Sequence, residues 1–250
     1  MPTAVIDGSD VSKRWLTKGA NPPVFKSCNG DPEFQIVPHS SHPLLPSKRL
    51  LKMPVVEIAW WPASDALLAD PTIVAPALDY ISKVDGCLSI YSGLAEDKKT
   101  VYAFIVWETI EHHKELMKHP EYPAVLGLAP SVGGELKLNH ITYVQDFVPS
   151  LTAPITEILG LTLKEGKTKE DLVNVFNNVG QIIDAANSKY APVAWGQALE
   201  DPQKFWVTLG WDSAKAQEDF AHQPSFLPSL MEMQSIAVPS LQLVSLKKAF

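Results

Sequence analysis

The order of expected secondary-structure elements occurs twice along this chain of 250 residues. In residues 54–144, β-branched and aromatic runs alternate with apolar residues at helical spacing. That pattern predicts the order strand, helix, strand, strand, helix, strand. Residues 155–246 predict the same order. A repeated βαββαβ order is typical of ferredoxin-like units, so we expect an α+β fold made of two such units.

Turn and capping residues place the elements of the first unit. Asp70 and Pro71 supply an N-cap and a first-turn proline, and Gly86 ends the helix that they begin. The strands are expected at residues 54–61, 87–94, 100–107 and 135–144, and the helices at about 71–84 and 109–118.

The second unit repeats these signals. Thr168 and Asp171 form a predicted capping box at the start of its first helix. The strands are expected at residues 155–163, 190–199, 205–211 and 241–246, and the helices at about 168–186 and 213–221. At an offset of 104 residues, Trp107 falls on Trp211 and Glu96-Asp97 falls on Glu200-Asp201.

Composition excludes several classes of protein. The chain is 46% hydrophobic and 20% charged, which suits a folded domain with a sizeable core. Its net charge of −7 argues against a nucleic-acid or anionic-membrane partner. The two cysteines form no disulfide framework, so a reducing, cytoplasmic compartment is expected. Residues 1–52 are rich in proline without a regular period, which predicts an irregular N-terminal arm before units at 53–149 and 150–250.

A short motif adds a family resemblance to this pattern. Trp107-Glu108 ends a strand, and Pro120 and Tyr122 follow the next helix, in the spacing W-E-x11-P-x-Y. The sequence resembles dimeric α+β barrel proteins, in the branch of the antibiotic-biosynthesis monooxygenases and the stress-responsive A/B barrel proteins. The resemblance covers residues 54–248, twice over. It implies that two ferredoxin-like units join their sheets into a barrel, here as a tandem duplication within one chain.

The resemblance implies a range of activities and not a single one. Members of these families include cofactor-free monooxygenases that oxidise phenols to quinones, haem-degrading oxygenases, polyketide cyclases, lactone isomerases and proteins without known activity. The family often has a histidine nine residues after the tryptophan, where this sequence has Leu116 in the first unit and Phe220 in the second. That departure argues against haem or standard monooxygenase chemistry.

Three of the seven histidines lie in the predicted helix of the motif or directly after it. Helical spacing puts His113 on the inner, sheet-facing side with Leu116, and puts His112 and His119 toward solvent. His140 alternates with Asn139 in the last strand of the unit, so one of the two faces inward. We expect His113 and His140 to be the catalytic pair, although a core-edge histidine bonded to backbone is an equal alternative for His113.

A ligand pocket is expected beside these histidines. Strand alternation places Glu57 on the same side as Trp61, where a buried carboxylate could act as acid or base. The residues expected to contact a substrate are Glu57, Trp61, Tyr91, Trp107, Leu116 and Tyr122. In the second unit Gln217 and Ser245 stand near the places of His113 and His140, which predicts that the first unit holds the working site.

Two functional hypotheses follow, with a weaker third. The first is an enzyme that acts on a small aromatic or polyketide-like substrate without a tightly bound cofactor or metal, by oxidising a phenol or by proton-transfer cyclisation or isomerisation. The second is a non-catalytic barrel that binds an apolar ligand or serves a stress response. The third is a haem-binding protein with His113 or His119 as axial ligand. The sequence leaves open whether two such pseudo-dimers associate into a homodimer.

Overall fold

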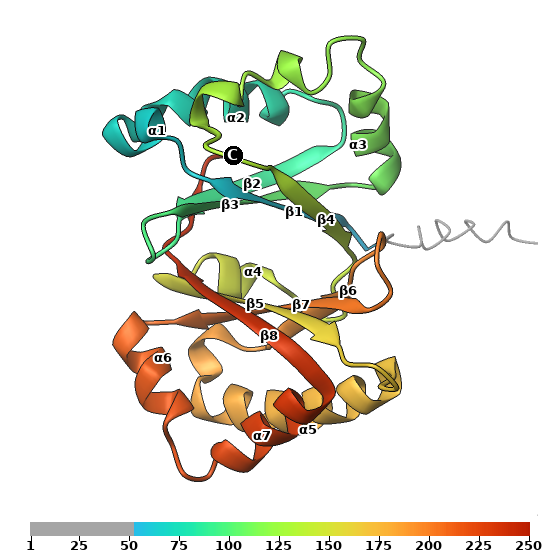
Figure 1. Cartoon of the computed structure of the whole chain (residues 1–250), viewed down its shortest axis with the longest axis vertical. Coiled ribbons are helices and arrows are strands. Elements are labelled where there is room, and N and C mark those ends of the chain that lie inside the picture. Colours follow the sequence, from blue (N-terminus) through green and yellow to red (C-terminus); the bar gives the residue numbers. More distant parts are fainter. Residues whose placement is uncertain (1–52) are drawn as a thin grey trace, which may run out of the picture. The chain divides into compact units, whose positions relative to one another are not determined.

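The computed structural model describes residues 53–250, which all belong to one compact unit. The N-terminal arm expected for residues 1–52 lies outside the described residues. Within the described part, the chain forms two antiparallel sheets with helices packed on their outer faces (Figure 1). The fold is therefore α+β, with one ferredoxin-like unit built around each sheet, as the repeated element order predicted.

The first sheet has the strand order β4-β1-β3-β2-β9, and the second has the order β6-β7-β5-β8. The strands of the first sheet are β1 (Val55–Pro62), β2 (Cys87–Leu94), β3 (Thr100–Trp107), β4 (Lys137–Ile141) and β9 (Lys247–Lys248). Those of the second sheet are β5 (Ile155–Leu163), β6 (Ala194–Gln197), β7 (Lys204–Trp211) and β8 (Ala237–Val244). Strand β9 lies at the C-terminal end of the chain, which thus returns to the first sheet.

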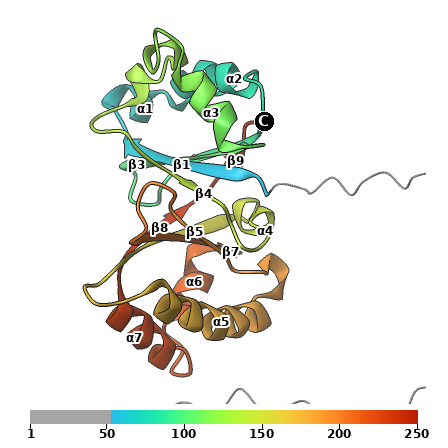
Figure 2. The ribbon, with the colours of Figure 1, turned by 90° about the vertical axis from the view of Figure 1, so that its right-hand side faces the viewer.

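Helices cover the outer face of each sheet, as Figure 2 shows from a second direction. The short helix α4 (Val148–Leu151) is an exception, since it lies between the two sheets and its Leu151 belongs to their shared core. The first half carries α1 (Asp65–Ala69), α2 (Ala75–Ser82) and α3 (Ile110–Met117). The second half carries α4 (Val148–Leu151), α5 (Lys169–Ala186), α6 (Ala214–Ala221) and α7 (Leu227–Ile236). Short 3-10 turns cover Pro71–Val74, Ala124–Leu126, Ala129–Ser131 and Ser188–Tyr190. Among the described residues, no helix combines the length and apolar character that a membrane span needs.

The inner faces of the two sheets share a buried core, because strand side chains alternate between the two faces of a sheet. Ile58 and Phe104 of the first sheet and Ile158 and Trp206 of the second belong to this core. The opposite faces pack on the helices. Helix α5 shows why: the Thr168–Asp171 capping box fixes its start, and an apolar stripe covers the second sheet.

Single backbone bridges join the two sheets at both edges of the barrel. Ile141, at the end of β4, pairs with Ala198 after β6, and Ala95 after β2 pairs with Val244 of β8. Next to these bridges, the backbone N–H of Leu199 donates to the carbonyl of His140 at 2.9 Å. These contacts bring the turn after β6 of the second half against strand β4 of the first half.

Several elements differ from the sequence-based expectation: β4 and β6 are shorter than predicted, and α1, α4 and β9 were not predicted. The helix expected at 71–84 is divided: Asp70 caps a 3-10 turn, and α2 begins only at Ala75. Strand β8 begins earlier than residue 241, at Ala237, since Pro239 is tolerated on an edge strand that needs no second partner. Helix α7 was not predicted, because its apolar residues do not gather on one face.

Candidate active site

A cavity of about 500 Å³ lies between the first sheet and its helices. Strands β1 and β3 form its floor with Ala59, Trp61 and Ala103, and helix α3 and the following loop form its roof. Ala59 lies directly opposite Ala103 in the strand register. Two small side chains at adjacent positions leave the space above the sheet open, so the cavity exists because of these two alanines.

Glu57 is a buried carboxylate at the polar end of this cavity. Its Oε2 accepts a hydrogen bond of 2.9 Å from Trp107 Nε1 and lies 3.3 Å from His113 Nδ1. The ring of His113 stacks on the ring of Trp107, with 5.2 Å between centroids and 3° between planes. The indole thus fixes both the carboxylate and the imidazole in position.

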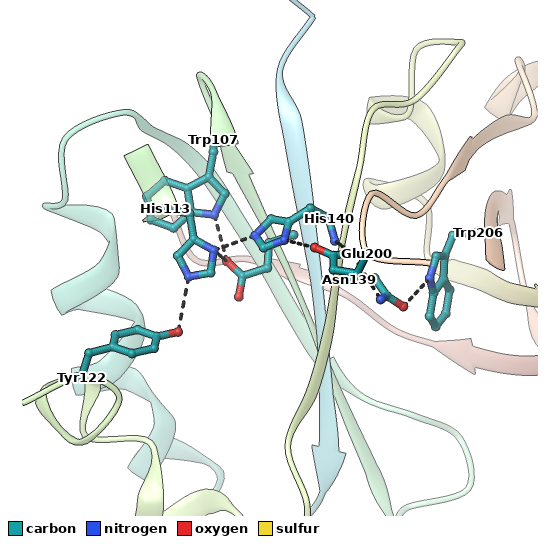
Figure 3. Close-up of polar contacts among 8 residues, drawn as sticks. Trp107, His113, Tyr122, Asn139, His140, Glu200 and Trp206 are labelled. Carbon is teal, nitrogen blue, oxygen red and sulfur yellow. Dashed lines mark hydrogen bonds and ion pairs between the residues drawn. The ribbon is translucent and has the colours of Figure 1, made fainter. Parts of the chain in front are cut away.

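The two histidines of the predicted catalytic pair are in direct contact (Figure 3). His113 Nδ1 lies 2.6 Å from His140 Nε2, and His140 Nδ1 lies 2.5 Å from Glu200 Oε1. The backbone N–H of His140 also donates to Glu200 Oε2 at 2.9 Å. On the other side, the hydroxyl of Tyr122 lies 3.4 Å from His113 Nε2. A continuous polar chain therefore runs from the cavity to the second half of the molecule.

One assignment of protons satisfies this whole chain. We assign both imidazoles as neutral: His140 Nδ1 then carries the proton, because Glu200 accepts from it, and His140 Nε2 carries a lone pair. The hydrogen bond between the imidazoles then requires the proton on His113 Nδ1. His113 Nε2 is left with a lone pair on the side of Tyr122, and both residues line the cavity.

Burial and neighbouring groups adjust the acidities in this cluster. Burial raises the pKa of Glu57 to about 7. Burial, followed by the repulsion that would arise if His113 and His140 were both protonated, lowers the pKa of His113 to about 4. Burial also raises the pKa of Glu200, but hydrogen bonds from His140 outweigh it and hold that pKa below its usual value. Burial raises the pKa of Tyr122 to about 12. Near neutral pH, His113 is thus a neutral acceptor, Glu200 an anion and Tyr122 a hydroxyl donor.

Trp61 contributes a donor without an acceptor to the cavity wall. Its side chain is 1% exposed, and among the described residues its Nε1–H has no hydrogen-bond partner. A buried unsatisfied donor costs about 1–3 kcal/mol. A bound molecule with a carbonyl or hydroxyl oxygen near Trp61 could satisfy it.

The structure brings most of the predicted site residues together. Glu57, Trp61, Trp107, Leu116 and Tyr122 line the cavity with His113. His140 does not line the cavity but supports His113 from behind, while its neighbour Asn139 faces the barrel and accepts a hydrogen bond from Trp206 Nε1.

The placement of Tyr91 in this pocket is wrong. Tyr91 pairs with Phe104 in the β2–β3 register, so both side chains lie on the barrel face of the sheet. The cavity lies on the opposite face of this sheet, under the helices. The sheet itself therefore separates Tyr91 from the cavity. The sequence did not reveal this, because strand β2 contains a bulge between Cys87 and Ser89 that breaks simple alternation.

Glu200 is the site residue that the sequence analysis missed. It lies in the turn after β6, far from His140 in the sequence, and becomes its partner only when the sheets meet. The turn from Ala198 to Lys204 is one residue longer than the corresponding turn from Ala95 to Thr100. The difference in turn length is visible in the sequence, but it indicates a contact with His140 only if one knows which strand edges of the two sheets meet.

The second half has a smaller cavity at the corresponding place, of about 310 Å³. Leu159 and Val207 lie opposite each other where the first half has Ala59 and Ala103. Glu157 Oε2 accepts a hydrogen bond of 2.9 Å from Trp211 Nε1, as Glu57 does from its tryptophan.

Neither histidine has a counterpart in this second cavity. Gln217 lines the cavity at the place of His113. The partner of Glu157 across the sheet is Leu243, as His140 is the partner of Glu57. The expectation that Ser245 stands near the place of His140 is therefore corrected: its hydroxyl donates to the carbonyl of Pro154.

Solved structures with this architecture include several oxygenase-like proteins. A monooxygenase candidate from Fusobacterium nucleatum subsp. nucleatum ATCC 25586 has 12% identity and a TM-score of 0.58, over 78% of this chain and 94% of its own. An anthrone oxidase-like protein has 11% identity and a TM-score of 0.60, over 79% and 94%. A second monooxygenase candidate, from Lactobacillus acidophilus NCFM, has 11% identity and a TM-score of 0.52, over 80% and 95%.

The chain has the dimeric α+β barrel fold, with both units in one polypeptide. No protein-family model matches the sequence, and no curated protein matches it. At such low identity the similarity concerns the fold, so the function must be argued from the residues of the cavity.

Proposed function

We propose that this chain is an enzyme that removes a proton from a small aromatic or polyketide-like substrate in the cavity of the first half, without a tightly bound cofactor. The observation that carries the proposal is the orientation of His113. Its Nε2 lone pair lies on the cavity side beside Tyr122, while its Nδ1 is hydrogen-bonded to the buried His140, which is in turn hydrogen-bonded to Glu200. A well-placed histidine base contributes typically about 10²–10⁴-fold to rate.

The hydrogen bonds define a path for the proton. A substrate hydroxyl gives its proton to His113 Nε2, and the proton on His113 Nδ1 passes to His140 Nε2. The proton on His140 Nδ1 then passes to Glu200, whose side chain is 39% exposed and can exchange with solvent. Each imidazole gains one proton and releases another, so neither carries a lasting charge in the buried cluster.

The cavity supports a flat, largely apolar substrate. Trp61 and Trp107 form its aromatic walls, and about 500 Å³ falls within the range of pockets for small organic molecules. Two polar groups suit such a substrate: the unpaired Nε1–H of Trp61 for a carbonyl or phenol oxygen, and His113 for an acidic hydroxyl.

Two reactions begin with this deprotonation. In the first, molecular oxygen attacks the phenolate ring; one oxygen atom remains in the quinone product, and the other leaves as water with two hydrogens from the substrate. In the second, the anion cyclises or isomerises and a proton returns to carbon. The monooxygenase candidates and the anthrone oxidase-like protein with this fold make oxidation the first choice. A cytoplasmic location stays a prediction.

The test is turnover of a panel of phenols, anthrones and linear polyketide analogues, with oxygen consumption and product mass followed together. We expect His113→Gln, which installs the residue of the second half, to lower kcat at least about 100-fold. Gln217→Ala in the smaller cavity is the matched control and should leave kcat unchanged. Product formation without oxygen would select cyclisation or isomerisation over oxidation.

Ligand binding without any turnover would contradict the enzyme proposal and favour a binding barrel. The second cavity supplies an observation in favour of that alternative, because it keeps apolar walls and a buried carboxyl without either histidine. Equal kcat in the wild type and His113→Gln would also exclude His113 as the base.

A further inference from the structure

Three buried donor groups converge at the polar end of the first cavity. Glu57 comes from β1, His113 from α3 and His140 from β4, and their side chains are at most 6% exposed. One ligand atom from each residue lies within 4.8 Å of the other two. Two imidazole nitrogens and one carboxylate oxygen are a donor set that divalent transition-metal ions prefer.

Outer hydrogen bonds already orient two of the three donors. Glu200 accepts from His140 Nδ1, which leaves the Nε2 lone pair directed toward His113 and Glu57. Trp107 Nε1–H holds the carboxylate of Glu57. A carboxylate behind a ligating histidine, and a donor behind a ligating carboxylate, are the usual outer partners of protein metal sites.

The spacing of the donors requires only a small adjustment. The two imidazole nitrogens lie 2.6 Å apart with a shared proton. Nitrogen ligands at about 2.1 Å from one tetrahedral ion lie roughly 3.4 Å apart. An ion that replaces the proton would therefore move the two rings apart by less than about 1 Å, which side-chain rotation can supply.

We propose that Glu57, His113 and His140 form a binding site for one divalent first-row transition-metal ion, with Zn²⁺ or Co²⁺ as the best fit. Glu57 and His113 line the cavity, so the ion would keep one side open to water or to a ligand there. Two imidazoles disfavour Mg²⁺ and Ca²⁺, which prefer oxygen ligands.

A metal ion and the proton path exclude each other. The ion uses the lone pairs of His113 Nδ1 and His140 Nε2, which are the two atoms that share the proton. The bound ion would displace that proton to His113 Nε2, so that the imidazole stays neutral but has no lone pair left on the cavity side. The path from the cavity to Glu200 would then be interrupted. We therefore infer that the metal ion is a reversible inhibitor. The inhibitory role rests on the proposed function, whereas the binding of the ion goes beyond it and can be measured without any substrate.

The second half provides an internal control for the donor set. It keeps the carboxyl–indole pair of Glu157 and Trp211, but Gln217 and Leu243 replace the two imidazoles. If a buried carboxyl beside a tryptophan were sufficient, both halves would bind an ion. The proposal requires one ion per chain.

The experiment is a Co²⁺ titration of the full-length, chelator-treated protein, followed by visible absorption and checked by metal analysis. We expect saturation at one Co²⁺ per chain with the intense bands of a four- or five-coordinate ion, and displacement by Zn²⁺. His140→Gln and Glu57→Gln should lower the affinity at least about 100-fold, and Glu200→Gln about 10–100-fold, since it removes only an outer partner. Circular dichroism and thermal unfolding of each variant, without metal, separate a lost site from a lost fold.

Three control variants locate the ion. Glu157→Gln, His119→Gln and the double variant His39→Ala/His42→Ala, which removes both histidines of residues 1–52, should all bind Co²⁺ as the wild type does. Loss of binding in one of these, or binding that persists in folded His140→Gln and Glu57→Gln, would overturn the proposal. A wild type that shows no saturable binding would overturn it as well.

Turnover measurements separate this proposal from the proposed function. Activity of the chelator-treated enzyme that Zn²⁺ abolishes at one equivalent would support both. Activity that requires the metal would overturn the inhibitory role and the proton path while the metal site stands. Activity that is unchanged with the site saturated would overturn the inhibitory role alone.

Discussion

The two halves of this molecule share an architecture but differ in what their cavities contain. Both have a buried glutamate hydrogen-bonded to a tryptophan at 2.9 Å, on equivalent strands. Only the first half adds two histidines, and only it keeps two facing alanines that open the cavity to about 500 Å³ instead of about 310 Å³. The shared pair therefore belongs to the fold, whereas the differences mark the site.

The largest expected effect comes from exchanging the cavity floors. Ala59→Leu with Ala103→Val gives the first half the side chains of the second. We expect binding of any aromatic ligand to weaken more than about 100-fold, because the larger side chains add roughly two to three carbon atoms at each position and fill the cavity. Titration of tryptophan fluorescence with the ligand measures this.

The reverse change in the second half is the control for that exchange. Leu159→Ala should destabilise the protein by about 2–5 kcal/mol, since it enlarges a cavity in a packed region. It should leave ligand affinity in the first half unchanged. Unaltered ligand affinity after the floor exchange would mean that the ligand binds outside the first cavity.

The next effect concerns the pH dependence of stability through Glu157. Burial raises the pKa of this carboxyl to about 7, from an ordinary value of 4.5. Below pH 4.5 the carboxyl is neutral in the folded and unfolded states. As pH rises toward 7 only the unfolded state loses the proton, so stability falls, by on the order of 3 kcal/mol in total. Glu157→Gln should remove this part of the decline.

Urea unfolding of the wild type and Glu157→Gln at about pH 4 and about pH 8 tests this. The variant should gain stability relative to the wild type at the higher pH. Curves that keep the same separation at both values would show that Glu157 ionises normally in the folded protein. Other titrating groups are common to both proteins and cancel in the difference.

A smaller effect tests whether the carboxyl–indole pair is a shared structural feature. Trp107→Phe and Trp211→Phe each remove the indole donor from a buried carboxyl. We expect a loss of about 1–3 kcal/mol from the hydrogen bond removed in each case, beyond the loss of packing that both variants share. Free energies of unfolding that differ strongly between the two would show that the pair serves different ends in the two halves.

The smallest expected effect is at His119, an exposed histidine just beyond α3. His119→Gln installs the residue that the second half has at this place and should change stability by less than about 0.5 kcal/mol. Turnover should not change. A loss of activity comparable to that of His113→Gln would place a working histidine on the outer surface instead of in the cavity.

Local signals predicted much of this fold. Strands β2 and β3 begin and end at the predicted residues, because apolar and β-branched runs there stop at clear turn residues. The capping box of α5 was also read correctly. Helix α7 was missed, since its contacts and not its own pattern hold it in place.

The candidate site was predictable where a single half forms it. Helical spacing placed His113 inward, and strand alternation put Glu57 beside Trp61. The faces of Tyr91 and Ser245 were not predictable, because a bulge and the register of an edge strand decide them. Glu200 was beyond reach for a different reason: its contact with His140 depends on how two sheets meet, and no local pattern encodes that.

The placement of both halves in one polypeptide has a genetic consequence. In a homodimer every mutation appears in both pockets, so a histidine gained or lost in one is gained or lost in the other. A fused gene removes that constraint: one copy can be selected for chemistry while the other is selected only for folding. The Glu200–His140 contact adds a limit, because the copy without the two cavity histidines supplies the carboxylate that the other copy uses. The two copies can therefore diverge but can no longer be inherited separately.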